Sequence, residues 1–244
     1  MAGHSKWNNI KRQKGAQDAK RGKLFTKIAR EITVAVREGG GDPSSNSRLA
    51  AAVAKAKAAS MPGDNIKRTI EKAQGTAGGD NYESIVYEGY GPSGVAVIIE
   101  AMTDNRNRTA AEMRHHFDKY GGNMGAVGSV SWSFDRKGVI IIDNEDGVHD
   151  EDKVMTDALE AGAEDIVTGE SVFEIYTTPE DFTAVSNTLE QQGYKFLSAQ
   201  VEMVPQNYIT LQSPDDIKNM EKMLDLMEDS DDVQNVWHNY ERED

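Results

Sequence analysis

The charge of this 244-residue chain is divided between its two ends. Residues 1–75 contain 16 Lys and Arg against 6 Asp and Glu, whereas the remaining 169 residues contain 11 against 35. A basic unit this compact is the electrostatic pattern expected of a protein that binds a phosphate backbone. The acidic remainder would be repelled by the same polyanion, so only the amino-terminal part is expected to dock. The alternative is that both blocks are solvated faces that keep the chain soluble and monomeric.

Composition narrows the class of protein further. The chain has no cysteine, which excludes disulfides, thiolate zinc sites and a cysteine nucleophile and fits a reducing compartment. Its longest apolar stretches, Val95–Ile99 and Val139–Ile142, have the length of strands and not of membrane spans. The basic first 17 residues lack the long Ser- and Arg-rich amphipathic stretch of a transit peptide. We therefore expect a cytoplasmic protein that does not contact a membrane.

Three helices are predicted in the basic part. The first spans 17–38, with apolar residues at i, i+3, i+4 spacing opposite a cationic stripe, and it ends at Gly39. The second spans 47–59 and is rich in alanine; the third follows a Met-Pro-Gly break, is capped by Asp64 and ends at Gly75. This pattern predicts a small bundle with one positive face. The apolar arc of the first helix comprises Leu24, Phe25, Ile28, Ala29, Ile32, Ala35 and Val36.

The expected nucleic-acid contacts are the arm ahead of these helices and the stripe on the first helix. Residues 1–14 interleave cations with amides and one tryptophan, which suits phosphate contacts, base or sugar recognition and ring stacking. Trp7 has two interpretations, a ring that stacks on bases or a plug in the bundle core. The predicted contact residues are Lys6, Trp7, Lys11, Arg12, Lys14, Lys20, Lys23, Lys27 and Arg30.

A weaker second site is predicted at Arg106 and Arg108. Both lie where a helix is expected to begin, although the helix macrodipole disfavours cations there. Asp104 and the neighbouring asparagines could cap this helix and hold the guanidinium groups. The other interpretation, which we favour slightly, is an anion contact made by the two arginines and the free N–H groups of the helix.

The acidic part follows a Gly-rich linker at 75–80 and predicts mixed α and β structure. Strands are expected at 83–88, 95–102 and 129–134 and a helix at 108–120, with a turn at 135–138 leading into a strand at 139–143. A helix at 150–161, strands at 164–168 and 171–177, a helix at 179–191 and a strand at 194–204 complete a β-α-β-β-α-β pattern, which is typical of ferredoxin-like folds. A strand at 208–211, a helix capped by Ser213 and a strand at 233–238 close the chain.

These elements predict an α+β protein of three domains. The pieces before 135 and after 205 are each too small to bury a core alone, so we expect them to form one layered domain. The domains would be a basic helical bundle at 1–78, a discontinuous α/β domain at 79–135 plus 205–244, and an inserted ferredoxin-like domain at 136–204.

No motif predicts catalysis. Gly89–Gly94 spells GxGxxG but joins strand to strand, which favours a turn over a dinucleotide site. Glu112 and His115 have metal-site spacing without a second copy, and the acidic run 143–152 misses the order of an EF-hand loop. Since a nucleophile elbow, a P-loop and an HExxH motif are all absent, we predict a protein that is not an enzyme, with no catalytic residue, metal or cofactor.

Several stretches carry a family resemblance: MAGHSKWNNIKRQKGAQDAKRGKLFTKIAREI, MPGDNIKRTIEKAQG, YEGYGPSGVAVIIE, TDNRNRTAAEMRHHFDKYGGNMGAVGSVSWSFDRKG and the closing helix–strand region. Over its full length the chain resembles the YebC family, also called PmpR or translational activator of cytochrome oxidase. The resemblance implies three domains arranged as above. It also implies a regulator that binds nucleic acid, because many bacterial members are described as transcriptional regulators that bind promoter DNA. Other members and the mitochondrial relatives look like ribosome-associated translation factors that assist polyproline synthesis.

The predicted function is therefore a non-enzymatic, nucleic-acid-binding regulator of gene expression, a DNA-binding transcription regulator of the YebC type. One alternative is a translation factor that binds ribosomal RNA, which the lack of a helix-turn-helix with base-reading residues supports. Another is a protein-interaction adaptor whose acidic domains dock a basic partner. The target sequence and the oligomeric state stay open.

Overall fold

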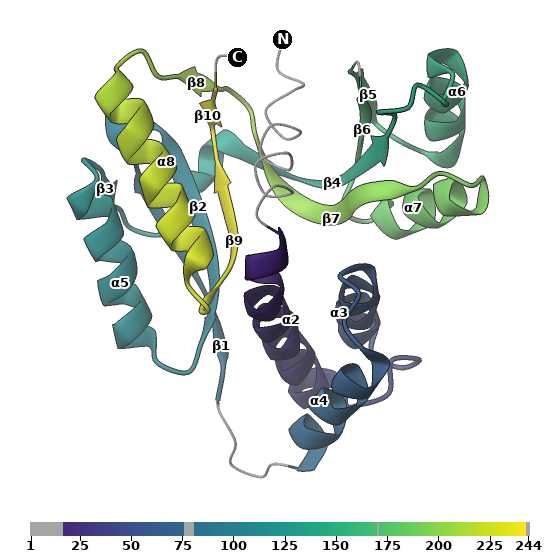
Figure 1. Cartoon of the computed structure of the whole chain (residues 1–244), viewed down its shortest axis with the longest axis horizontal. Helices are drawn as coiled ribbons and strands as arrows, with labels where there is room; N and C mark the ends of the chain where they lie inside the picture. Colours follow the sequence, from purple (N-terminus) through teal and green to yellow (C-terminus); the bar gives the residue numbers. More distant parts are fainter. Residues whose placement is uncertain (1–16, 76–80, 170, 243–244) are drawn as a thin grey trace. The chain divides into compact units, whose positions relative to one another are not determined.

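The computed structural model describes residues 17–75, 81–169 and 171–242 (Figure 1). Three helices come first and mixed α and β elements follow, so the predicted α+β class is confirmed. The chain forms two compact units: residues 15–130 with 211–238, and residues 131–210 with the carboxyl-terminal residues from 239. No helix in the described ranges is long and apolar enough to cross a membrane. The predicted linker at 75–80 lies almost entirely outside the described residues.

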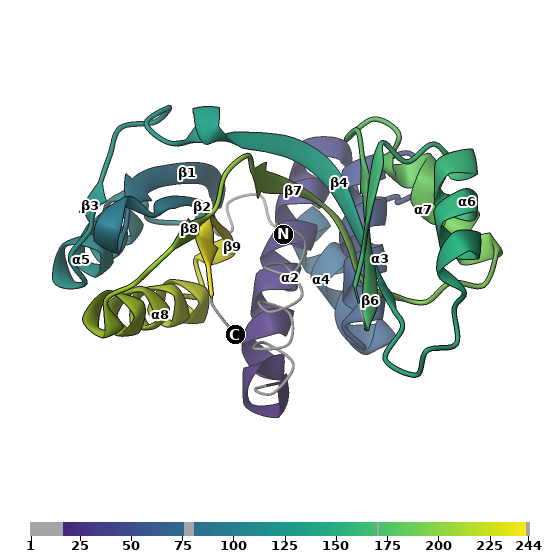
Figure 2. The same ribbon diagram turned by 90° about the horizontal axis from the view of Figure 1, so that it is seen from above.

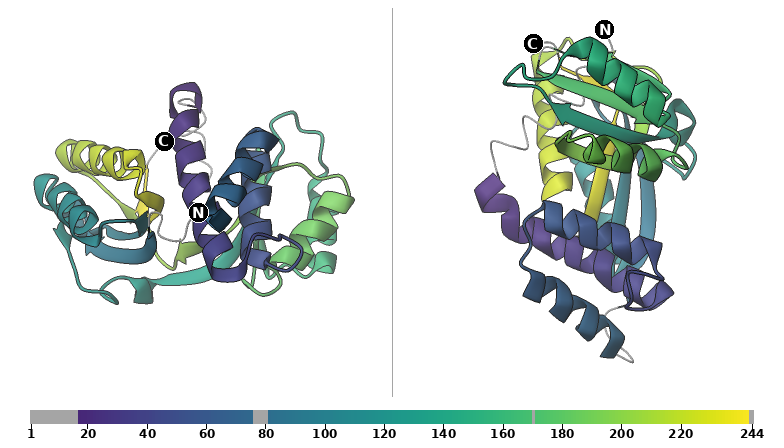
Figure 3. Two further views of the ribbon diagram at one scale, coloured as in Figure 1. Left: turned by 90° about the horizontal axis from the view of Figure 1, so that it is seen from below. Right: turned by 90° about the vertical axis from the view of Figure 1, so that its right-hand side faces the viewer.

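The first unit begins with the predicted helical bundle, α2 (Gln17–Gly39), α3 (Ser47–Ala58) and α4 (Gly63–Gly75), which Figure 3 shows packed together. Apolar residues of all three helices share one core. The predicted arc needs one correction, because Leu24 is 41% exposed whereas Val34 is buried. Asp64 lies in the first turn of α4 and does not precede it, since that helix begins at Gly63. The core includes Ile28, Ile32, Ala35, Leu49, Ala56, Ile66 and Ala73.

Asn46 fixes the connection between α2 and α3. Its side-chain oxygen accepts a hydrogen bond from the backbone N–H of Leu49 at 3.0 Å, which caps α3. Its amide nitrogen donates to the carbonyls of Ala35 and Gly40, both at 2.8 Å. A buried amide with all these partners stabilises the turn, because leaving any of the groups unpaired in the interior would be costly.

The same unit contains a four-stranded antiparallel sheet in the order β3-β1-β2-β9. Its members are β1 (Glu83–Tyr90), β2 (Ala96–Thr103), β3 (Asn123–Met124) and β9 (Val233–His238). Helices α5 (Arg106–Lys119) and α8 (Pro214–Asp229) cover one face of this sheet (Figure 2). Ser213 caps α8 as predicted. Buried methionines of both helices, Met113, Met220, Met223 and Met227, fill the layer beneath the sheet.

The connection from β1 to β2 is the predicted turn. Strand β1 ends at Tyr90, a 3-10 turn spans Pro92–Gly94, and the antiparallel partner of Tyr90 is Ala96. Gly94 has φ +80°, a left-handed conformation that favours glycine. Because no helix follows, the GxGxxG spelling here does not form a dinucleotide fingerprint.

The second unit contains the predicted β-α-β-β-α-β succession. It comprises β4 (Phe134–Asp143), α6 (Glu151–Ala161), β5 (Asp165–Thr168), β6 (Val172–Thr177), α7 (Phe182–Gln191) and β7 (Phe196–Pro205). The strand order is β5-β6-β4-β7, and every neighbouring pair is antiparallel. Ile140, Ile142, Phe173 and Ile175 pack with α6 and α7 on one face, as the period of two along a strand requires.

The predicted strand at 129–134 and the turn at 135–138 are wrong. Strand β4 runs without interruption from Phe134, which pairs with Pro205, to Asp143. Strand β6 joins β4 only from Gly138 onward, so the first residues of β4 pair with β7 alone. With one neighbouring strand, this end of β4 is polar, and its sequence therefore resembles a turn. A Cβ at Gly138 would lie 2.2 Å from Thr177 Oγ1 and 2.7 Å from the Phe182 ring. The glycine therefore serves close packing and not a turn.

The strand predicted at 208–211 also needs a correction. It is shortened to β8 (Ile209–Thr210) and pairs in parallel with β10 (Tyr240–Glu241). These two strands form a small sheet of their own in the second unit, separate from the sheet that contains β9.

The packing role of Gly138 makes a testable prediction. We expect Gly138→Ala to lower the free energy of unfolding by about 1–3 kcal/mol, the usual cost of an extra methyl group in a filled space. Gly22→Ala is a matched control, because Gly22 lies in the second turn of α2 and a Cβ there meets nothing within 4 Å. It should raise stability by about 0.5–1 kcal/mol through helix propensity. Urea unfolding of both variants measures this, and equal effects would contradict the packing role.

Candidate nucleic-acid interface

The cationic stripe of α2 consists of Lys20, Lys23, Lys27 and Arg30, spaced along one side of the helix. The predicted arm residues lie outside the described residues, as does the side chain of Lys20. These arm residues are Lys6, Trp7, Lys11, Arg12 and Lys14. The geometry of the interface therefore comes from the remaining three cations of the stripe.

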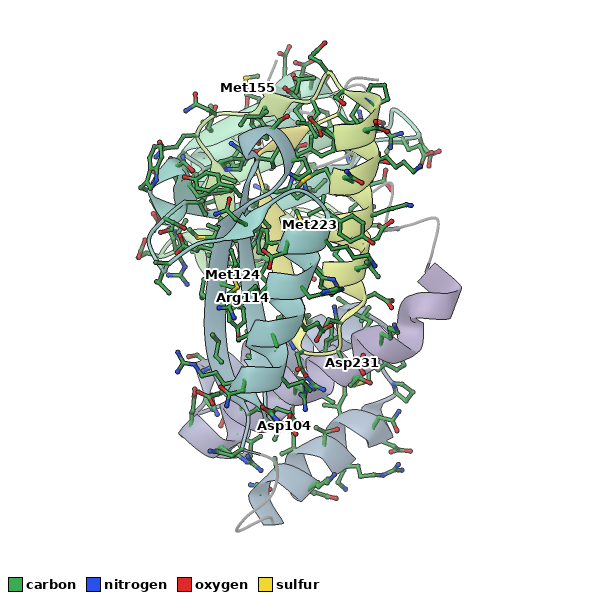
Figure 4. All side chains as sticks on the ribbon, turned by 90° about the vertical axis from the view of Figure 1, so that its left-hand side faces the viewer. Asp104, Arg114, Met124, Met155, Met223 and Asp231 are labelled. Atoms are coloured by element: carbon green, nitrogen blue, oxygen red, sulfur yellow. The ribbon has the colours of Figure 1, made fainter. Side chains whose placement is uncertain are left out.

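Lys23 and Lys27 contact the end of α8. We call residues Glu228–Asp232, which carry four carboxylates in five positions, the acidic turn. Lys23 Nζ lies 2.6 Å from the Asp229 carboxylate and donates to the Asp229 carbonyl at 3.2 Å, while Lys27 Nζ donates to the Glu228 carbonyl at 2.7 Å. Figure 4 shows Asp231 where α8 ends beside α2. Burial lowers the pKa of Lys27 to about 8, although Glu228, Asp231 and Asp229 raise it.

Arg30 reaches a more deeply buried carboxylate. Its Nη1 lies 2.5 Å from Asp232 Oδ1 and also donates to the Met102 carbonyl at 3.1 Å. The guanidinium lies over the Tyr82 ring, 5.1 Å from its centroid. Only 14% of the Arg30 side chain and 6% of the Asp232 side chain are exposed. Arg30 is thus a buried ion-pair partner and not a solvated cation.

Asp232 also receives hydrogen bonds from the end of β2 and the start of α5. The second carboxylate oxygen accepts from Arg108 at 2.8 Å, from Thr109 at 2.7 Å and from Thr103 at 3.1 Å. We call this carboxylate and its donors the Asp232 node. Burial raises the pKa of Asp232, but the hydrogen bonds from Arg108, Thr109 and Arg30 outweigh it and bring the pKa down to about 2.

The two arginines of the predicted second site lie in different environments. Arg108 donates to Asp104 at 2.8 Å as well as to Asp232, and these hydrogen bonds raise the pKa of Arg108. Asn105 caps α5 by accepting from the backbone N–H of Arg108 at 3.1 Å. The described contacts of Arg108 are therefore those of the bracing interpretation. The side chain of Arg106 is exposed.

Exposed cations on α3 and α4 were not among the predicted contacts. They lie on the side of each helix away from its buried apolar residues, and amphipathic spacing already predicts that Lys67, Arg68 and Lys72 of α4 face outward. Lys67 is 77% exposed and only 3.8 Å from Glu71, and within the described ranges neither Lys57 nor Arg68 forms an ion pair. Arg48 of α3 is also exposed but is paired with Glu38, and the other exposed cations of these two helices are Lys57, Lys67, Arg68 and Lys72.

The titratable cluster on α5 is not organised as a metal site. His116 Nε2 lies 3.7 Å from Glu112 Oε1, and the rings of His115 and His116 are tilted with centroids 6.0 Å apart. Burial lowers the pKa of His116. In the part of the chain that the structure describes, no group of three or more His, Asp or Glu side chains is placed to hold a metal ion.

Comparisons with known proteins cover nearly the whole chain. Residues 5–76 match the family model described as the TACO1/YebC protein N-terminal domain, and residues 82–240 match the TACO1/YebC second and third domain. A probable transcriptional regulatory protein of Acetivibrio thermocellus is 58% identical over 240 residues, covering 98% of this chain and 99% of the relative. One of Geobacillus kaustophilus is 57% identical over 239 residues, covering 98% and 97%. The crystal structure of the conserved hypothetical protein Aq1575 from Aquifex aeolicus has a TM-score of 0.84 at 44% identity and covers 93% of each chain.

The Asp232 node predicts a large difference between two acidic residues of the same turn. Asp232→Asn should lower the free energy of unfolding by about 3–5 kcal/mol, because it leaves a buried guanidinium without its counter-charge. Asp229→Asn removes an ion pair whose side chains are 43% and 48% exposed. It should cost less than about 1 kcal/mol. Urea unfolding of both variants tests this, and a small effect of Asp232→Asn would show that the node does not stabilise the fold.

The environment of Lys27 predicts a dependence of stability on pH. Its pKa is lowered from 10.5 to about 8 in the folded chain, so the folded state binds fewer protons than the unfolded state between these values. Stability should therefore rise as the pH increases from 8 toward 10.5. Lys27→Met removes the titrating group and should flatten this part of the profile. Thermal unfolding of both proteins at a series of pH values from 8 to 10.5 measures this dependence. An equal rise in stability with pH in both proteins would contradict the prediction.

Proposed function

Because the chain belongs to the TACO1/YebC family, we propose that it is a non-enzymatic, nucleic-acid-binding regulator of gene expression. The observation that carries the proposal is the basic helical bundle, whose exposed cations on α3 and α4 face away from its core. Clustered cations on one part of an acidic chain provide the sequence-independent share of nucleic-acid affinity. Since the named relatives are probable transcriptional regulatory proteins, we propose DNA as the first candidate ligand.

We propose the contact residues in two groups. The arm residues and Lys20 are proposed from sequence alone. Lys23 and Lys27 are proposed as the described cations of the α2 stripe, whose geometry is given above. Arg30 is buried in the Asp232 node, so we propose that it positions α2 and does not itself meet phosphate. Arg106 is the better candidate of the second site, because Arg108 is already paired with two carboxylates. To these we add Lys57, Lys67, Arg68 and Lys72.

Ribosomal RNA is the second candidate ligand, because the surface of α3 argues against base-specific readout of duplex DNA. Apart from its cations, the exposed face of this helix consists largely of Ala50, Ala51, Ala54 and Ala58. A recognition helix needs amide, guanidinium or carboxylate groups that reach base edges in the major groove. Alanines and lysines favour backbone contacts, which structured RNA and duplex DNA both offer. A ribosome-associated factor in translation, including the synthesis of polyproline stretches, fits this surface.

We further propose that the chain is organised as three domains. The helical domain would span 1–78, the discontinuous α/β domain 79–135 plus 205–244, and the inserted ferredoxin-like domain 136–204. The separate core of α2–α4 and the order β5-β6-β4-β7 support this division, as does the extent of the N-terminal family model.

The salt dependence of binding tests the interface. In the full chain, changing Lys57, Lys67, Arg68 and Lys72 to Gln should flatten the slope of log K against log[salt] by about 0.7–0.9 for each lost phosphate contact. The control variant replaces four exposed cations of the acidic part, Arg136, Lys195, Lys218 and Lys222, with Gln and changes the net charge equally. Fluorescence anisotropy with duplex DNA and with ribosomal RNA measures both. Equal slopes in the two variants would refute the assignment of the bundle face.

Sedimentation distinguishes the two ligands. Bacterial lysate is layered on sucrose gradients with and without RNase, and the position of the wild-type chain is followed. Migration with ribosomes that RNase abolishes would support the translation alternative, whereas retention on promoter DNA without ribosome association would support the transcription regulator.

A further inference from the structure

The described cations of the α2 stripe face a segment with the chemistry of a polyanion. Lys23 and Lys27 donate to the Asp229 carboxylate and to the carbonyls of Asp229 and Glu228, which are closely spaced oxygen acceptors. A phosphate backbone offers acceptors of the same kind, because its anionic oxygens repeat along the chain. The stripe that sequence predicts as a phosphate contact is therefore partly covered by the protein itself.

The end of α8 explains why these lysines are held there. The last turn of α8 carries Glu228 and Asp229 and no basic residue. Carboxylates are unfavourable at the carboxyl end of a helix, where the macrodipole is negative and the last carbonyls lack partners. Lys23 and Lys27 supply from another helix the positive charge and the donors that α8 lacks. The contact is thus favourable for α8 in the absence of any ligand.

The contact between α2 and the acidic turn is strongest at Asp232 and weaker at Asp229. At Asp232 the ion pair with Arg30 is buried, and three further donors fix the carboxylate. At Asp229 the ion pair with Lys23 is almost half exposed on both sides, where water and salt screen it. One end of the acidic turn is therefore anchored, while the other is weakly held.

We propose that Glu228–Asp231 form a displaceable acidic cover over Lys23 and Lys27, anchored at Asp232, which the phosphate backbone of a bound nucleic acid replaces. This inference rests on the proposed function, since it specifies how the same stripe is regulated. On binding, phosphate oxygens take over the hydrogen bonds of the two lysines, and the last turn of α8 moves away while the Asp232 node stays intact. Because the cover competes with phosphate for the two lysines, it lowers the affinity of the chain for nucleic acid.

Neutralising the cover tests the proposal in the full chain. The cover variant is Glu228→Gln/Asp229→Asn/Asp231→Asn, which leaves Asp232 in place. The control is Glu145→Gln/Asp146→Asn/Asp152→Asn, three exposed carboxylates of the second unit, and it changes the net charge equally. We expect the cover variant to bind a 20-nucleotide single-stranded RNA and a duplex DNA about tenfold more tightly than the control, since screened ion pairs of this kind are individually weak. Equal affinities of the two variants would overturn the proposal.

A double-mutant cycle tests whether the lysine and the cover act on each other. Lys23→Gln is made in the wild-type chain and in the cover variant. If phosphate and the cover compete for Lys23, its loss should weaken binding severalfold more in the cover variant, where this lysine is already available. Additive effects would show that the acidic turn and Lys23 act independently in binding.

A distance measurement separates the failure of this inference from that of the proposed function. The chain has no cysteine, so spin labels at Gly22→Cys and Ser230→Cys report only on α2 and the acidic turn. Saturating RNA should lengthen and broaden the distance distribution between the two labels. An unchanged distribution with binding intact would overturn the cover and leave the proposed function standing. The absence of binding by the wild-type chain and by every variant would overturn both.

Discussion

A single buried carboxylate joins parts of this chain that are far apart in sequence. Asp232 accepts hydrogen bonds from Arg30 of α2 and from Thr103, Arg108 and Thr109 around the start of α5. Burying a charge is costly unless it is fully paired, and here both oxygens of the carboxylate accept hydrogen bonds. The orientation of the α2 stripe, the side chains at the start of α5 and the path from α8 into β9 all depend on this node. It therefore sets which basic residues remain available for a ligand.

Much of the fold could be predicted because local rules decide it. The helices α2 to α4 follow from apolar spacing and glycine stops, and the element order from β4 to β7 was predicted correctly. The start of β4 was not, because Asp135, Arg136 and Lys137 before a glycine resemble a turn when their strand partner is unknown. The reason lies in β7, which is more than 50 residues away in sequence and supplies the hydrogen bonds. Register and strand order depend on such distant partners, which periodicity does not contain.

In the candidate interface too, local spacing predicts part of the arrangement and distant partners decide the rest. Periodicity correctly places the cations of α2 opposite most of its apolar arc, but it does not say whether water or another element meets them. The burial of Arg30 and the contacts of Lys23 and Lys27 with the acidic turn depend on residues about 200 positions away. The exposed cations of α3 and α4 gave no stronger signal in the sequence than those of α2. Amphipathic spacing places the cations of α4 on the surface, and the packing of the bundle shows that they stay exposed there.

The sequence separation within the Asp232 node has a consequence for the chain as it is synthesised. The node joins residues 202 and 124 positions apart, and its acidic member lies near the carboxyl end. Domains tend to fold from the amino terminus as they emerge, so the bundle can form long before its acidic partner exists. Until the acidic turn has been synthesised, Arg30 and the two lysines beside it lack the partners that they contact in the folded chain. The bundle without the acidic turn therefore presents a more positive surface than the folded chain does.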